Sequence, residues 1–147
     1  MKKKKSIKRV LKKPVKKKIP AILHFEIPVD LYHSKVCFLI CKDKEGARKF
    51  TEVWFESTCE PFKATAYGTT VFKQGYPTVV WLEHFPKTPS DYGALAHETG
   101  HAAFVMLRDL GMGFTDDSEE AFTYLQEYLV TEFLIHRDKL HGKNTRT

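Results

Sequence analysis

Five consecutive residues in the second half of the chain, His97-Glu98-Thr99-Gly100-His101, combine two imidazoles with a carboxylate. On a helix, side chains four positions apart lie one above the other on the same face. The two histidines would therefore reach one metal ion, and zinc is commonly bound by imidazole nitrogens. Glu98 would lie beside the pair and act as a general base on a zinc-bound water. The spacing predicts a zinc site with hydrolytic chemistry.

The surroundings of this motif favour a zinc site over two ordinary histidines beside a solvated glutamate. A strand-like segment, residues 77–84, precedes the motif, and the helix that carries it is expected from about Tyr92 to Leu110. Glycine inside a helix costs about 1 kcal/mol relative to alanine, so a close approach is expected at Gly100. Small residues near the histidines leave room for a metal and for helix packing: Ala94, Ala96, Gly100, Ala102 and Ala103.

A zinc site of this kind needs a third protein ligand. The next helix, expected to begin near residue 117, offers two carboxylates in its first turns, Glu119 and Glu120. We favour Glu120, because positions 120, 124 and 128 stack on the helix face that is expected to meet the motif helix. In the alternative, Asp117 and Glu120 form a capping box that satisfies helix N–H groups and needs no metal.

Hydrolysis of a peptide bond also needs a donor that stabilises the developing oxyanion. Tyr124, one turn beyond Glu120, is the residue we select as a catalytic candidate. Tyr128, His136 and His141 stay open as alternatives, because no spacing singles out any of the four.

The histidine motif, followed by a glutamate on the succeeding helix, resembles the gluzincin clan of zinc metallopeptidases. The helix start Ser118-Glu119-Glu120-Ala121, with Tyr124-Leu125 after it, is similar to small peptidase-like proteins encoded by bacteriophages. The resemblance covers about residues 64–135. It implies zinc on His97, His101 and Glu120, and a peptide or protein substrate bound in extended form along the strand Val79–Trp81.

Two departures narrow this resemblance. The metzincin continuation would place glycine at 104 and histidine at 107, where the chain has Phe104 and Leu107. The thermolysin-like branch has an asparagine just before the glutamate ligand and an aspartate four residues after it. Here those positions are Glu119 and Tyr124. The chain is therefore expected to be neither a metzincin nor a thermolysin-like enzyme.

The order of the expected elements predicts an α+β fold, with a small, largely antiparallel sheet packed against the motif helix and a C-terminal helix. Strands are expected at 21–27 and 35–41, an amphipathic helix at 43–56, and a hairpin at 64–73 and 77–84. The domain is expected to span residues 20–137, followed by a polar tail at 138–147.

The positive charge is concentrated at the N-terminus. Residues 1–18 hold 11 of the 24 Lys and Arg and no acid, which leaves 13 basic against 18 acidic residues elsewhere. A segment this rich in lysine cannot form a packed core, so residues 1–19 are expected to be a disordered tail. The tail would either bind nucleic acid or another polyanion through phosphates, or only keep the protein soluble.

The remaining composition indicates a soluble globular protein. No apolar run has the roughly 20 residues that span a membrane, and no secretory signal follows the basic N-terminus. Cys37, Cys41 and Cys59 match no metal or disulfide spacing and are expected to be small apolar residues in a reducing compartment. These features predict a cytoplasmic location, which would be the host cytoplasm or the virion if the protein is phage-encoded.

The leading functional hypothesis is a zinc-dependent peptidase with a narrow substrate or with activity inside a larger assembly, since 147 residues leave little chain for a deep cleft. One alternative is a non-catalytic protein in which zinc stabilises a structural or interaction module, such as a virion component. Retention of Glu98 argues against it, because structural zinc needs no general base. The other alternative is a nucleic-acid-associated protein that acts through its basic tail.

Overall fold

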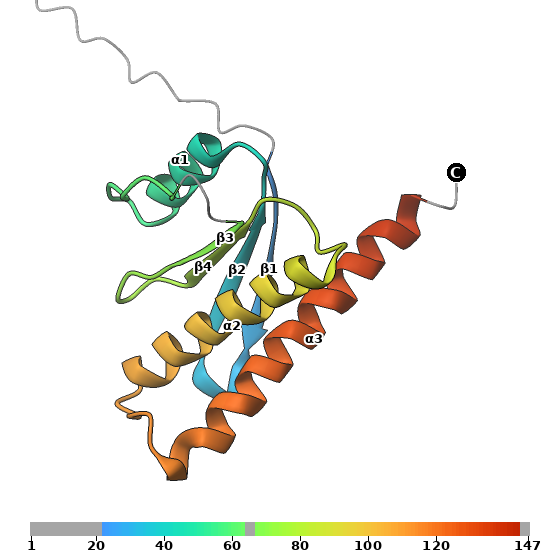
Figure 1. Ribbon diagram of the computed structural model, residues 1–147. Helices are drawn as coiled ribbons and strands as arrows, with labels where there is room; N and C mark the ends of the chain where they lie inside the picture. The colour runs from blue at the N-terminus through green and yellow to red at the C-terminus, as the bar shows by residue number, and fades with distance from the viewer. Residues whose placement is uncertain (1–21, 64–66, 145–147) are drawn as a thin grey trace, which may run out of the picture.

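The computed structural model describes residues 22–63 and 67–144, which form a mixed four-stranded sheet covered by helices on both faces (Figure 1). The α+β class expected from the sequence is confirmed. The strands are β1 (Leu23–Val29), β2 (Ser34–Ile40), β3 (Gly68–Val71) and β4 (Thr78–Leu82). The helices are α1 (Lys44–Trp54), α2 (Pro89–Asp109) and α3 (Glu119–Asn144), with short 3-10 turns at Asp30–Tyr32 and Asp116–Ser118.

The strands lie in the order β1-β2-β4-β3. The pairs β1–β2 and β3–β4 are antiparallel hairpins, whereas β2 and β4 run parallel. Parallel neighbours need a long crossover connection, and the chain supplies one through α1. This order places β4 inside the sheet and leaves β3 at one edge, so only β3 has a free backbone edge on that side.

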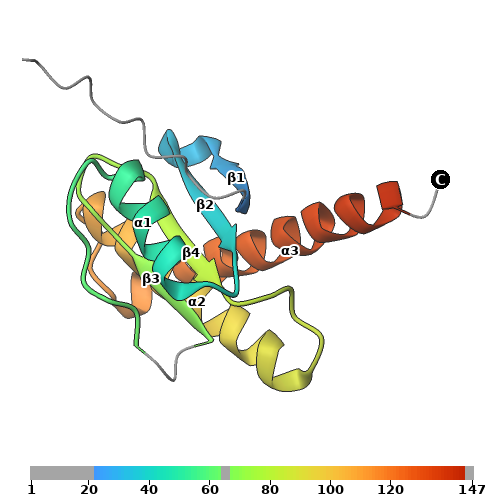
Figure 2. The same ribbon diagram turned by 90° about the horizontal axis from the view of Figure 1, so that it is seen from above.

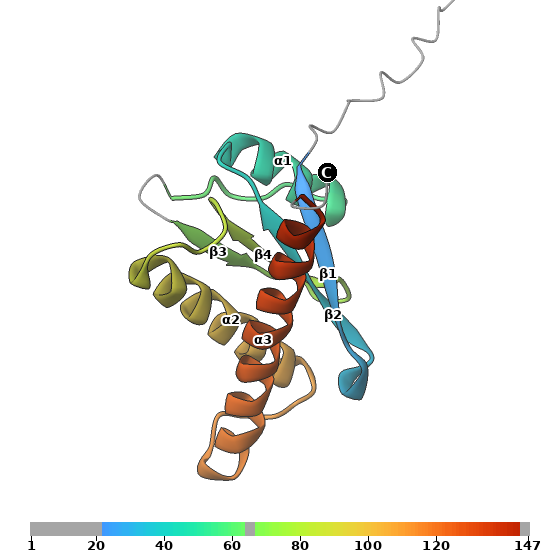
Figure 3. The same cartoon turned by 90° about the vertical axis from the view of Figure 1, so that its right-hand side faces the viewer.

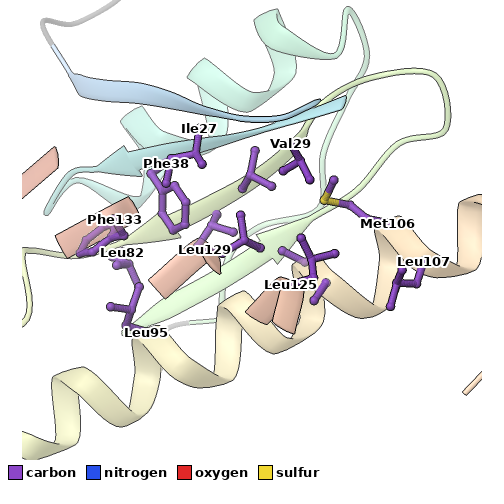
Figure 4. Close-up of a cluster of buried hydrophobic side chains, with 14 residues drawn as sticks. Ile27, Val29, Phe38, Leu82, Leu95, Met106, Leu107, Leu125, Leu129 and Phe133 are labelled. Atoms are coloured by element: carbon purple, nitrogen blue, oxygen red, sulfur yellow. The ribbon is translucent and has the colours of Figure 1, made fainter. Parts of the chain in front are cut away.

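The two faces of the sheet are buried by different helices because successive strand residues point to opposite faces. On one face, α1 packs over a cluster that contains Cys37, Leu39, Val79 and Trp81. On the other face, α2 and α3 cross over the sheet together (Figure 3). The larger core there is drawn in Figure 4 and includes Ile27, Val29, Phe38, Leu82, Leu95, Met106, Leu107, Leu125, Leu129 and Phe133. The site of interest lies on α2 beside this core.

The motif helix begins earlier than the sequence patterns suggested. Thr88 is its N-cap, and Thr88 and Asp91 form a reciprocal capping box around Pro89, which occupies the first turn. Proline fits there because the first-turn N–H groups have no partner within the helix. The expected start near Tyr92 was therefore wrong by about one turn. Gly111, with φ of +78°, adopts the left-handed conformation that ends many helices.

The C-terminal helix runs past the expected domain boundary at residue 137 to Asn144, and extends beyond the rest of the molecule (Figure 2). Two contacts support these late turns. Arg137 donates to the Tyr92 hydroxyl at 2.7 Å, and the His141 ring meets Phe85 edge-on. The expected polar tail at 138–147 is therefore helical as far as the structure describes it. Across 22–63 and 67–144, no helix is both long and apolar enough to cross a membrane.

Candidate metal and hydrolytic site

His97 and His101 lie one turn apart on α2 with their rings in contact. Their Nε2 atoms are 3.0 Å apart, and both side chains are exposed. Two nitrogens bound to one tetrahedral zinc at about 2.0–2.1 Å would lie about 3.3 Å apart. The rings would need to separate by only a few tenths of an ångström to hold the ion. The pair therefore fits two of the ligands that the sequence predicted.

Glu98 lies beside the histidine pair but points into a different environment. Its side chain is buried, with 8% of its surface exposed. The Thr70 hydroxyl on β3 lies 2.7 Å from Glu98 Oε2 and 2.8 Å from the Glu98 main-chain oxygen, so it donates its single proton to one or the other. A buried carboxylate is costly unless it is hydrogen-bonded. The shorter of the two contacts, to Oε2, allows Thr70 to supply that hydrogen bond.

Gly68, two residues before Thr70, makes room for the same glutamate. A Cβ atom at Gly68 would lie 2.8 Å from Glu98 Cγ, closer than real Cβ contacts allow. Alternate residues of a strand share a face, so Gly68 and Thr70 both point toward α2. Val71, with the opposite orientation, packs toward α1. The face of β3 that meets α2 is therefore shaped around Glu98.

A cleft of about 810 Å³ opens beside these residues. His97, Glu98 and His101 line it from α2, and the edge strand β3 lines it from the sheet. The segment after α1 forms the remaining wall and brings aromatic and charged side chains. The lining residues outside α2 include Phe55, Cys59, Glu60, Phe62, Lys63, Phe72 and Lys73. The three motif side chains thus face a space large enough for a short peptide segment.

The structure does not bring Glu120 to the histidine pair. Glu119 and Glu120 are both exposed at the start of α3. Among the residues that the structure describes, no three His, Cys, Asp or Glu side chains are clustered closely enough to hold a metal ion. The 3-10 turn before α3 has a capping box that joins Thr115 and Ser118, and the described residues form no such box between Asp117 and Glu120.

The face of α3 that was expected to meet α2 points elsewhere. Tyr124 and Tyr128 line a separate hollow with the Asp30–Tyr32 turn, and the Tyr128 hydroxyl donates to the Pro28 carbonyl at 2.7 Å. Burial raises the pKa of Tyr128. Tyr124 is 66% exposed and lies outside the cleft lined by His97. The structure therefore does not support Tyr124 as an oxyanion donor.

The two histidines named as alternative donors also lie away from the cleft. His136 stacks on Phe25 with ring centroids 5.1 Å apart, and His141 contacts Phe85. Neither lines the space beside His97. Of the candidate metal ligands and catalytic residues named in the sequence, the structure thus brings His97, Glu98 and His101 to the cleft.

The strand expected to bind an extended substrate was misassigned. The segment Val79–Trp81 lies in β4, which pairs with β2 on one side and with β3 on the other. All five β4 residues are buried. A strand with neighbours on both sides has no free N–H or C=O groups for a peptide, so β3 is the strand that can serve this purpose.

The close approach predicted at Gly100 occurs against α3. A Cβ at Gly100 would lie 3.2 Å from Gln126 Nε2, and that amide donates to the Ala96 carbonyl at 2.7 Å. The glycine therefore lets Gln126 reach the backbone of the motif helix. This contact holds the two helices together on the side of α2 that faces away from the sheet edge.

The remaining sequence predictions concern the N-terminal tail and the three cysteines, of which Cys59 lines the cleft. Residues 1–19, with their expected polyanion binding, lie outside the described residues. Cys37, Cys41 and Cys59 are free thiols. Cys37 is fully buried, and burial raises its pKa to about 12, as expected for a small apolar core residue.

Thr70 and Gly68 are the site residues that sequence patterns did not reveal. The signal that could have found them is the contrast between the two arms of the hairpin. The apolar arm, Thr78–Leu82, has the composition of a strand inside a sheet. The other arm, Gly68–Val71, has one glycine and two threonines, a composition typical of an edge strand. The residues that contact Glu98 had to lie on the edge arm.

Comparisons with known proteins give no information on the function of this chain. No protein-family model, no curated protein and no solved structure matches the chain. The paired imidazoles and the buried, hydrogen-bonded Glu98 are therefore the observations from which a function is inferred.

Proposed function

We propose that the protein is a zinc-dependent peptidase whose general base is Glu98. The observation that supports this proposal is that two exposed imidazoles and a buried carboxylate lie next to one another on the same helix. The imidazoles of His97 and His101 are exposed with their Nε2 atoms 3.0 Å apart, and the Glu98 carboxylate is buried beside them at the same cleft. Two candidate metal ligands at a cleft, with a carboxylate next to them, form the arrangement expected for metal-assisted hydrolysis of a peptide bond.

Each group would have a defined task. His97 and His101 hold the zinc ion, which when bound polarises the substrate carbonyl and lowers the pKa of water toward about 7. Glu98 accepts a proton from the attacking water and then delivers it to the leaving amine. Thr70 keeps one Glu98 oxygen occupied, which leaves the other oxygen for proton transfer.

We propose Glu120 as the third metal ligand, with Glu119 as the alternative. Both side chains are exposed, and within the described residues neither carboxylate accepts a hydrogen bond or forms an ion pair. Moving either carboxylate toward the histidines would therefore break no packing of its own. Its cost would be the reorientation of the first turn of α3.

The substrate we propose is an extended peptide segment lying along the free edge of β3. An edge strand presents unpaired N–H and C=O groups that can pair with an added strand. This edge borders the cleft that contains Glu98 and the histidine pair. A peptide bound there would pass close to both the metal ligands and the base.

A purely structural zinc site is the competing interpretation. Structural sites are closed by four protein ligands and join separate segments of a chain. Here the two available imidazoles come from a single helix and are exposed at a cleft. This openness favours a catalytic site, in which a position is kept for water or substrate.

Metal content tests the proposal. Elemental analysis of the purified wild type is expected to give about one zinc per chain, and His101→Ala is expected to lose it. Glu120→Ala and Glu119→Ala, measured in parallel, identify the third ligand by which of them loses zinc. A wild type that stays free of zinc after purification without chelators, and again after reloading, would overturn the proposal.

A further inference from the structure

Thr70 occupies a position that joins the substrate edge to the general base. Its hydroxyl contacts Glu98 from the sheet side, and its strand is the one that borders the cleft. We propose that Thr70 is a positioning residue, whose hydroxyl fixes the Glu98 carboxylate while its backbone N–H and C=O bind the substrate peptide. This inference rests on the proposed peptidase function and deepens it.

The direction of the Thr70 backbone follows from the hydrogen bonds of the hairpin. The Glu83 amide donates to the Tyr67 carbonyl at 3.0 Å, which marks residues 67 and 83 as a hydrogen-bonded pair. In an antiparallel ladder such pairs alternate with pairs that share no hydrogen bond. The next hydrogen-bonded partner of β4 is therefore Thr69, opposite Trp81. Gly68 and Thr70 direct their N–H and C=O groups to the free edge.

Of these two residues, Thr70 is the one whose outward carbonyl accepts no hydrogen bond from a neighbouring side chain in the described structure. The Gly68 carbonyl already accepts a hydrogen bond from the Thr69 hydroxyl at 2.7 Å. Thr70 thus presents a donor and an acceptor to an added strand, in the spacing that a single peptide residue can match. A peptide residue paired with Thr70 is held by the same residue that holds Glu98.

The hydroxyl matters because Glu98 is buried. With 8% of the residue exposed, the Glu98 carboxylate has little access to bulk water that could replace a lost protein partner. Without the Thr70 hydroxyl, Oε2 has no hydrogen-bond partner among the described residues, so no hydrogen bond fixes the orientation of the carboxylate. A misplaced base slows proton transfer, although the edge of β3 still binds the peptide.

The decisive variants change the hydroxyl and keep the shape of residue 70. Thr70→Val is expected to lower kcat by about 10- to 100-fold, the usual effect of removing a partner that orients a catalytic group, with KM and zinc content unchanged. Thr70→Ser keeps the hydroxyl and is expected to stay within about threefold of wild type. Rescue by serine separates a role of the hydroxyl from a role of the β-branched shape.

Thr131→Val is the matched control, because Thr131 is an exposed threonine on α3 that does not line the cleft. Wild-type kcat in Thr70→Val would overturn the inference, and so would an equal loss in Thr70→Ser and Thr70→Val. If Thr70→Val does not fold, Thr70→Ala against Thr70→Ser decides by the same criterion. A wild type that binds zinc but cleaves no peptide would instead refute the peptidase proposal and the inference with it.

Discussion

Glu98 and Glu120 have opposite surroundings in this protein. Glu98 is buried between α2 and β3, where Thr70 donates to its carboxylate and Gly68 leaves space for its side chain. Glu120 is exposed at the start of α3, with no partner for its carboxylate in the described chain. The first carboxylate has its position built into the fold, and the second keeps its freedom to move.

The difference shows which part of a zinc site a small domain can build in advance. Groups on one helix, and on the strand packed against it, are fixed by backbone geometry. A ligand on the following helix depends on the turn between the helices, here residues 110–118. We therefore expect the general base to be preorganised and the third ligand to be recruited when the metal binds.

The largest effect is expected when the Glu98 carboxylate is neutralised. Glu98→Gln is expected to reduce peptide hydrolysis by about 10²- to 10⁴-fold, because the base is lost and the two histidines remain. Zinc content, measured by elemental analysis, is expected to stay near one per chain. Glu127→Gln, an exposed glutamate on α3, is the control and is expected to retain wild-type rates. Full activity in Glu98→Gln would remove Glu98 from the mechanism.

A second prediction acts on the space around Glu98. Gly68→Ala adds a Cβ 2.8 Å from Glu98 Cγ, so the glutamate must shift. Overpacking of this kind costs about 1–3 kcal/mol, and we expect a rate decrease of roughly tenfold or more. Gly93→Ala is the matched control, since no atom lies within 4 Å of its added Cβ and alanine favours a helix. Equal rates in the two variants would show that Glu98 tolerates displacement.

The strand segments and the α+β class could be predicted from the sequence, whereas the order of the strands, the parallel pairing of β2 with β4 and the roles of the strands could not. Alternating and apolar runs predicted the hairpin and the α+β class. The resemblance implied that the strand before the motif helix, Val79–Trp81, binds the substrate, but the apolar pattern of β4 is typical of a strand with neighbours on both sides. The edge role of β3 depends on the strand order, which follows from the parallel pairing of β2 with β4.

The site likewise has residues that the sequence could predict and residues that it could not. The i, i+4 spacing of His97 and His101 was sufficient, because a helix alone brings such side chains together. The prediction for Glu120 and Tyr124 depended on which face of α3 is turned toward α2, and the sequence does not determine this orientation. Tyr128 bonds to Pro28, which turns that face of α3 toward β1. Thr70 was not singled out, because its contact with Glu98 joins residues 28 positions apart and depends on which arm of the hairpin lies at the sheet edge.

A third prediction concerns the opposite side of α2. Gln126→Ala removes the hydrogen bond from the Gln126 amide to the Ala96 carbonyl, and we expect the free energy of unfolding to fall by about 1 kcal/mol. Urea denaturation measures this change. Activity is expected to stay near wild type, because the contact lies away from the cleft. A loss of activity without a loss of stability would show that α3 orients the histidine pair.

The smallest expected effect involves a third acidic residue, Asp91, which is half-buried and accepts hydrogen bonds as Glu98 does. Hydrogen bonds from the Lys87 and Thr88 backbone lower the pKa of Asp91 below its ordinary value of 3.8. Its contribution to stability is therefore fully present above pH 3.8 and lost as the pH falls through the lowered pKa. Thermal unfolding of wild type and Asp91→Asn is expected to differ at neutral pH and to converge in acid. A difference that persists in acid would contradict this role.

If the paired histidines and the buried Glu98 form a hydrolytic zinc site, peptide cleavage depends on both zinc and Glu98. The most direct test incubates the full-length protein with a mixture of peptides, after chelation and again after reloading with zinc, and reads the products by mass spectrometry. We predict that new peptide termini appear only with the zinc-reloaded protein and not with zinc-reloaded Glu98→Gln. One zinc per chain without any cleavage, or equal cleavage by Glu98→Gln, would contradict the account.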